Sequence, residues 1–181
     1  MKRSAVAIVV GVLVLGVVAT ALWLWPYSVR EFRGDGQITD TGFWSYPRYQ
    51  VRFPPVELSQ AGQHTFTCRG LPPAPLTLLL ATAGKDEAAY DSLSRIGTVV
   101  TVRIDDDTGQ TVYSASGPLK AWVLMWGYPG NAGGYWHENC RDMRLRRGRT
   151  YQLGVGVTAV DPAAPAVVVQ PTLEGGGNEL P

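Results

Sequence analysis

Five arginines fall within nine residues near the end of the chain, in the stretch RDMRLRRGR at 141–149. Guanidinium groups bind carboxylates and phosphates through paired hydrogen bonds, so an exposed arginine cluster predicts a site for an acidic protein, anionic lipid headgroups or an anionic glycan. Alternatively, the charges protect an edge strand against aggregation. If this strand neighbours 48–53, Arg48 and Arg52 extend the cationic face. The arginines expected to form the site are Arg144, Arg146, Arg147 and Arg149.

Aromatic side chains form a second candidate site, in the segment WVLMWGYPGNAGGYW at 122–136. Trp122 and Trp126 share one face of an expected strand, which predicts that they fill the core. Three further aromatic residues flank the loop GYPGNAGG, where exposed rings would stack on sugars or anchor a protein partner. These loop aromatics are Tyr128, Tyr135 and Trp136.

The two cysteines, Cys68 and Cys140, are predicted to form a disulfide, because the domain is expected to be exported into an oxidising compartment. The bond would close a loop of about 70 residues and stabilise the fold by about 4 kcal/mol through the unfolded state. A metal site at His137, Glu138 and Cys140 is the competing interpretation. It lacks a fourth ligand at zinc spacing, since His64 is the only other histidine, so no metal is expected.

The acidic triple Asp105, Asp106 and Asp107 has the side chains for a calcium site or for a turn. A calcium site draws its ligands from several loops, and the sequence contains no second acidic cluster to supply them. The stretch DDTG at 106–109 therefore predicts a hairpin turn between two strands.

Signatures of catalysis are missing from the sequence. There is no G-x-S-x-G nucleophile motif, only two histidines are present, and no glycine-rich phosphate loop joins a strand to a helix. With 16 basic and 15 acidic residues the chain is nearly neutral, which excludes the large basic surface that nucleic-acid binding needs. We expect a protein that is not an enzyme, carries no cofactor and binds no nucleic acid.

The N-terminal segment contains a long uncharged run, which decides how the candidate residues lie relative to a membrane. Lys2 and Arg3 precede the uncharged run AVAIVVGVLVLGVVATALWLW at 5–25, which at about 20 residues is long enough to cross a bilayer as a helix. Trp23 and Trp25 would lie at the outer membrane–water interface, where aromatic residues are enriched. The segment therefore predicts a single-pass transmembrane anchor.

A cleaved signal peptide is the alternative, because Ala19-Thr20-Ala21 has the form of a signal-peptidase site. In both cases the basic residues keep 1–4 in the cytoplasm, and the rest of the chain lies on the extracytoplasmic, periplasmic side of the cell membrane. Residues 26–36 are polar and lack periodicity, which predicts a short tether between membrane and domain.

Alternation of apolar and polar residues dominates 37–175 and predicts antiparallel strands that bury one face. The turn sequences at 106–109 and at Arg147-Gly148 stand at hairpin spacing between strands. Helical spacing at 86–96 predicts one short crossover helix, and the glycine-rich residues 176–181 form a tail. The strands are expected at 48–53, 63–69, 76–81, 98–104, 110–114, 119–126, 142–146, 151–159 and 166–173.

This strand count predicts an all-β fold, an antiparallel β-sandwich of the jelly-roll or immunoglobulin-like type. With an anchor and no catalytic signature, the favoured function is a non-catalytic accessory or inhibitory module that binds another envelope protein. The alternatives are a carbohydrate-binding module that uses the aromatic loop, and a structural envelope protein without a discrete ligand.

Overall fold

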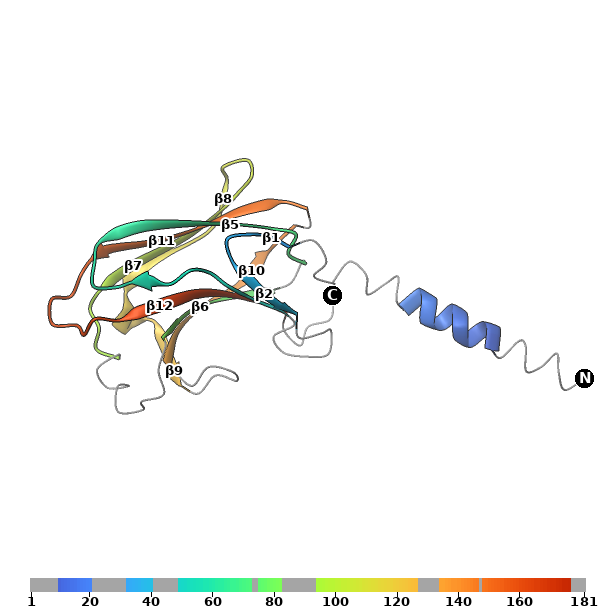
Figure 1. Ribbon diagram of the computed structural model, residues 1–181, viewed down its shortest axis with the longest axis horizontal. Helices are drawn as coiled ribbons and strands as arrows, with labels where there is room; N and C mark the ends of the chain where they lie inside the picture. The colour runs from blue at the N-terminus through green and yellow to red at the C-terminus, as the bar shows by residue number, and fades with distance from the viewer. Residues whose placement is uncertain are drawn as a thin grey trace, which may run out of the picture.

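A computed structural model describes residues 10–20, 32–40, 49–72, 75–82, 94–126, 134–146 and 148–176, with backbone only at 40, 125–126 and 134–144. The fold is all-β and antiparallel, with two sheets that lie as layers one above the other (Figure 1). One turn of 3-10 helix, η3 (Leu119–Ala121), joins β8 to β9. The strands are β1 (Arg33–Gly34), β2 (Gln37–Asp40), β3 (Tyr49–Arg52), β4 (Val56–Glu57), β5 (Gly62–Arg69), β6 (Pro75–Thr82), β7 (Val99–Asp106), β8 (Thr111–Pro118), β9 (Val123–Trp126), β10 (Gly134–Arg144), β11 (Thr150–Ala159) and β12 (Val168–Gly175).

The smaller sheet has five strands in the order β1-β5-β11-β7-β8. Strict alternation along β7 buries Val100, Val102 and Ile104, as the sequence predicts, while Arg103 stays on the outer face. The same alternation holds on β5 and β11, where Phe66 and Leu153 stand directly opposite each other. The outer face of this sheet is consequently polar and its inner face apolar.

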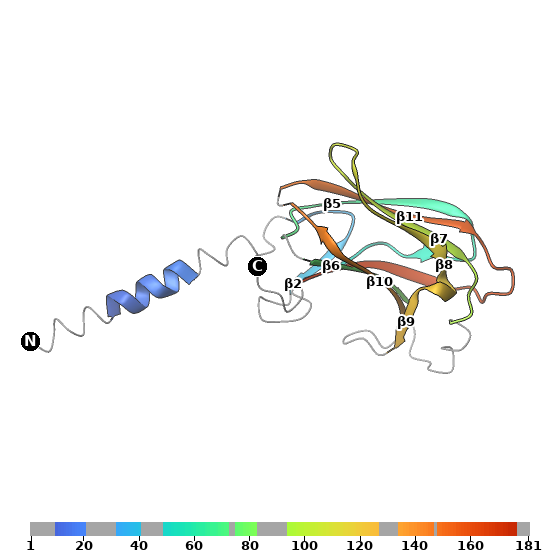
Figure 2. The ribbon, with the colours of Figure 1, turned by 180° about the vertical axis from the view of Figure 1, so that it is seen from behind.

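The larger sheet has seven strands, with β2-β3-β12-β6-β10-β9 in order and β4 paired to β12. Its strand β6 is buried on both faces, because Leu78 and Leu80 enter the main core while Leu79 and Ala81 form a separate buried cluster. This explains the nearly continuous apolar run of β6, which shows no clear alternation. Figure 2 shows the same layers from behind, with β10 crossing the middle of the domain and β9 below it.

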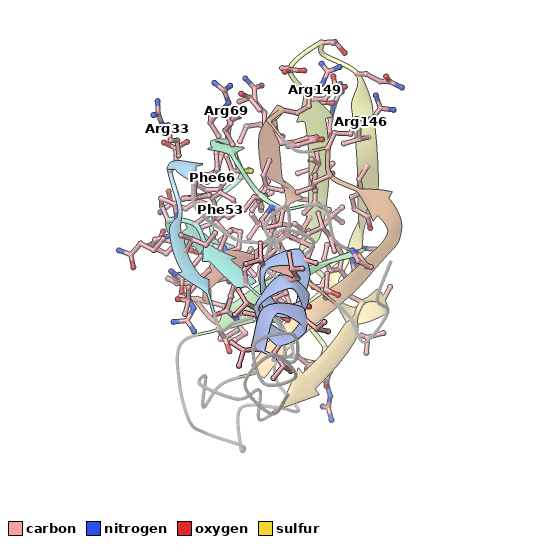
Figure 3. The ribbon with its side chains drawn as sticks, turned by 90° about the vertical axis from the view of Figure 1, so that its right-hand side faces the viewer. Arg33, Phe53, Phe66, Arg69, Arg146 and Arg149 are labelled. Atoms are coloured by element: carbon pink, nitrogen blue, oxygen red, sulfur yellow. The ribbon has the colours of Figure 1, made fainter. Side chains whose placement is uncertain are left out.

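Side chains from both sheets meet in one core. Phe66 of β5 stacks on Phe53, which follows β3, with ring centroids 5.3 Å apart and an interplanar angle of 29° (Figure 3). Tyr151 and Leu173 contribute from the two strands nearest the C-terminus. Trp122 and Leu124 are partly buried and pack against this core, which agrees with the core interpretation for Trp122, whereas the side chain of Trp126 lies outside the described residues.

The N-terminal apolar run contains a helix over residues 10–20, and every one of its residues is exposed. The Thr20 hydroxyl donates to the Gly16 carbonyl at 2.8 Å within it. Across the described residues, no helix has both the length and the apolar character needed to span a membrane. The remaining parts of the expected span, 5–9 and 21–25, lie outside the described residues.

One local expectation lies mostly outside the described residues, and another is corrected. Most of the expected helix at 86–96 lies outside the described residues, but Ser94 and Arg95 form a turn, and the Ile96 carbonyl accepts the Lys120 N–H at 2.9 Å. The range expected to be a tether also enters the domain, because β1 pairs with β5 and Phe32 packs against the core.

The connection at Arg147-Gly148 is not a hairpin. A tight turn forms there, with the Arg149 N–H donating to the Arg146 carbonyl at 3.3 Å and Gly148 at a φ of +79°. However, β10 pairs with β6 and β9, whereas β11 pairs with β5 and β7. The turn therefore carries the chain from one sheet to the other.

Candidate functional site

Four arginines lie at the end of the five-stranded sheet where β1 begins, and we call them the basic end: Arg33, Arg69, Arg146 and Arg149 (Figure 3). Arg33 stands directly opposite Arg69 in the β1–β5 pair, and Thr150 stands opposite Arg69 on the other side. Because Arg149 precedes Thr150, the register brings the β10–β11 connection to the same end of the sheet. Arginines distant in the sequence thus lie at one end of the sheet, where Asp107 of the β7–β8 turn also lies.

The β10–β11 connection is held by specific contacts. The Arg146 N–H donates to the Tyr151 hydroxyl at 2.7 Å, and the neighbouring Leu145 is buried. Arg149 forms an ion pair with Asp107 of the β7–β8 turn, and this hydrogen bond and charge raise the pKa of the guanidinium. Residues 146 and 149 of the connection are therefore held by specific contacts, although the Arg146 side chain is exposed.

Three of the four arginine side chains have no acidic partner among the described residues. Arg33, Arg69 and Arg146 are exposed, and within the described part of the chain they form no ion pair or side-chain hydrogen bond. Only Arg149 has an acidic partner there, in Asp107. The basic end can therefore bind carboxylate or phosphate groups without first breaking an internal ion pair.

The structure divides the arginines predicted from the sequence. Arg146 and Arg149 lie at the basic end, whereas Arg144 is a backbone position on β10 opposite Pro75 and Arg147 lies outside the described residues. Arg52 does not extend this surface, because β3 pairs with β2 and β12 and not with β10. Its Nε donates to the Gln50 side chain at 2.8 Å instead.

The aromatic site is only partly described. Tyr135 and Trp136 were expected at a loop, but they belong to β10. There they stand opposite Met125 and Leu124 of β9. They lie on a strand because β9 and β10 pair from Gly134 onward. Tyr128 lies outside the described residues, as does the loop beside it.

The predicted disulfide between Cys68 and Cys140 is not formed in the structure, where Cys68 is a free thiol. Cys68 lies on β5 and Cys140 on β10, so the two positions belong to different sheets. Burial, together with the charge of Asp35, raises the pKa of the Cys68 thiol to about 12. The protonated thiol is thus the stable form in the core at neutral pH.

Each aspartate of the acidic triple has a structural contact. Asp106 caps the turn, since its Oδ1 accepts the Thr108 hydroxyl at 2.6 Å and the Thr108 N–H at 2.9 Å, and these bonds lower its pKa. Arg103 donates to Asp105 at 2.8 Å and lowers the pKa of that carboxyl, while Asp107 holds Arg149. The predicted turn at 106–109 is confirmed, and the described residues contain no cluster of metal ligands.

Arg33 and Arg69 were missed by sequence reasoning. Each is an isolated arginine in its own segment, and no local pattern relates positions 36 residues apart. The signal available was the alternation of β5, which places Arg69 on the outer face, but it does not name the opposing strand.

Comparison with known proteins adds no assignment to this geometry. No protein-family model matches the chain, and no curated protein is detectably similar to it in sequence.

Proposed function

We propose that this chain is a membrane-anchored, exported β-sandwich of the jelly-roll or immunoglobulin-like type that binds an acidic segment of another envelope protein. It acts as an accessory or inhibitory module without catalysis of its own. The observation that carries the proposal is the β10–β11 connection, where exposed Arg146 has no ion-pair partner among the described residues and lies beside the Arg149–Asp107 pair.

The anchor is supported by the N-terminal apolar run. Helix 10–20 exposes valine and leucine side chains on all sides, such as Val12, Leu13 and Leu15, each more than 60% exposed. Apolar side chains without a protein surface to cover them are stabilised by lipid. A single-pass span over 5–25 would satisfy them and leave the domain on the periplasmic side.

A protein partner fits the connection better than a mobile polyanion. The Arg146 N–H of the connection is already bonded to the Tyr151 hydroxyl, so the connection needs little ordering when a partner binds. Asp107 beside Arg149 gives the surface charges of both signs, which favours a partner with a complementary pattern. Arg144 and Arg147, from the same segment, are included in the proposed site.

The proposal can be tested by affinity capture from envelope extract, with the detergent-solubilised full chain as bait and mass spectrometry of the retained proteins. Three baits are compared: the natural chain, Arg146→Glu, and Arg95→Glu. Arg95 is a matched control, because it is exposed and precedes β7 at the opposite end of the five-stranded sheet. Each substitution changes the net charge equally.

We expect one protein to be retained by the natural chain and by Arg95→Glu but lost with Arg146→Glu. Reversal of a charge in a complementary interface weakens binding by several kcal/mol. The same set of proteins on all three baits would refute the site. Retention of a glycan without a protein would instead support the aromatic residues Tyr128, Tyr135 and Trp136.

A further inference from the structure

Arg33 and Arg69 are like charges placed directly opposite each other in an antiparallel pair. Directly opposed side chains have their Cβ atoms about 5 Å apart, and like charges at that distance destabilise the pairing. Both are exposed, and neither forms an ion pair with another described residue. An anion bound between them would replace this repulsion with attraction.

Asp35, two residues after Arg33, forms no ion pair with either arginine. Asp35 follows β1, but its Oδ2 accepts the Thr67 N–H at 2.6 Å, and its own N–H donates to the Thr67 carbonyl at 2.9 Å. These two bonds hold the end of β1 against β5. On the other side of Arg69 stands Thr150, which carries no charge. Figure 3 shows Arg33 and Arg69 pointing the same way, out from the sheet.

Chain connectivity keeps this pair near the membrane. The proposed span ends at Trp25, and Arg33 lies eight residues further on. Fully extended, the chain between them reaches about 25 Å, and any bend shortens it. The electrostatic attraction of an anionic bilayer acts over about 10 Å in 0.1 M salt, a distance that the tether allows. Among macromolecular anions, the lipid headgroups are therefore the ones that the connectivity places beside this pair.

We infer that Arg33 and Arg69 together bind the phosphate of an anionic phospholipid headgroup and hold this end of the domain against the membrane surface. The inference rests on the anchor in the proposed function, but not on the protein partner. Two guanidinium groups on neighbouring strands offer the phosphate oxygens several charge-assisted hydrogen bonds. The β10–β11 connection, further along the basic end, then remains available to a protein.

The test uses the full chain inserted into bilayer nanodiscs of either phosphatidylglycerol or phosphatidylcholine. Phenylglyoxal modifies accessible guanidinium groups, and mass spectrometry gives the rate at each arginine. We expect Arg33 and Arg69 to react about fivefold more slowly in the anionic discs, since one arginine near such a surface contributes about 1 kcal/mol and 1.4 kcal/mol is tenfold. Arg95 should react equally in both lipids, and 1 M salt should remove the difference.

Variants show whether the two arginines act as a pair. With Arg69→Gln we expect Arg33 to react at nearly the same rate in both lipids, whereas Arg95→Gln should leave the lipid difference unchanged. If Arg33 keeps its lipid-dependent protection in Arg69→Gln, the paired site is refuted.

The remaining outcomes distinguish a lipid headgroup from free phosphate as the bound anion. They also distinguish failure of this inference from failure of the proposed function. Equal rates in both lipids refute the inference and leave the proposed function standing. Protection in phosphatidylcholine discs on addition of inorganic phosphate would assign the site to free phosphate and refute the membrane contact. If the full chain does not enter the discs, as judged by size-exclusion chromatography, the anchor is wrong and the inference falls with it.

Discussion

Gly175 stands directly opposite Tyr49 in the β12–β3 pair, and the tyrosine ring occupies the space that a side chain at 175 would need. A Cβ built on Gly175 would lie 1.9 Å from Tyr49 Cζ. The ring is buried, and its hydroxyl donates to the Pro72 carbonyl at 3.1 Å. The buried ring of Tyr49 therefore requires a residue without a side chain at position 175.

Gly175→Ala should destabilise the domain by about 1–3 kcal/mol, the usual cost of overpacking a filled core. The midpoint of urea unfolding, followed by tryptophan fluorescence, measures this loss. Gly154→Ala is the matched control in another strand, because its Cβ would meet no atom closer than 3.7 Å. Equal effects of the two substitutions would contradict the explanation.

Phe66→Ala should destabilise the domain by about 3–5 kcal/mol, because it removes a buried ring that packs across the two sheets onto Phe53. Phe66→Leu keeps most of the apolar volume and should cost much less. Chemical denaturation of both variants makes the comparison. If Leu and Ala are equally destabilising, the ring contact is not what is lost.

Asp161 should make stability depend on acid pH. Its carboxylate accepts the Gly97 N–H at 2.8 Å and the Ala163 N–H at 2.9 Å, and these bonds lower its pKa. The unfolded chain, with a pKa of about 3.9, therefore binds the proton first as the pH falls. The contribution is complete above that pH and is lost as the pH falls through the lower folded-state pKa.

Asp161→Asn tests this, since it keeps an acceptor oxygen but does not titrate. We expect the natural chain to be the more stable at neutral pH, and its advantage to shrink as urea midpoints are taken from about pH 5 to about pH 2.5. An advantage that stays constant over this range would show that the charge is not responsible.

Cys68 should resist alkylation in the folded protein. Its thiol is buried, and its pKa is raised to about 12, so the reactive thiolate is scarce at pH 8. After unfolding without reductant, iodoacetamide should label Cys68, as read by peptide mass spectrometry. If labelling requires prior reduction, Cys68 is in a disulfide, as the sequence predicts.

Strand positions were predictable because burial on one face leaves a local pattern. The alternation of β7 and β11 placed Val102, Ile104 and Val155 in the core, where the structure has them. Gln50 shares the polar face of the expected strand 48–53 with Arg48 and Arg52, yet it is buried and donates to Glu174 at 2.7 Å. Alternation of apolar and polar residues shows that the two faces of a strand differ in polarity. It does not show whether other parts of the protein cover the polar face.

Sheet membership and the basic end were not predictable. The turn at 146–149 has the spacing of a hairpin, but its flanking strands join different sheets, and no residue in the turn encodes that difference. Arg33 and Arg69 meet only through pairing between distant segments. The arginine cluster was visible because its members are neighbours in sequence.

The order of the strands also has a consequence for how the chain is made. β11 is the middle strand of the five-stranded sheet, and β12 lies between β3 and β6 in the other. Both are synthesised last, so neither sheet can close while residues 150–175 are still unmade. Contacts that join distant segments form slowly in any case. The polypeptide therefore cannot complete its fold until its last strands are made. An incompletely folded chain is the state that the proposed export through a membrane would require.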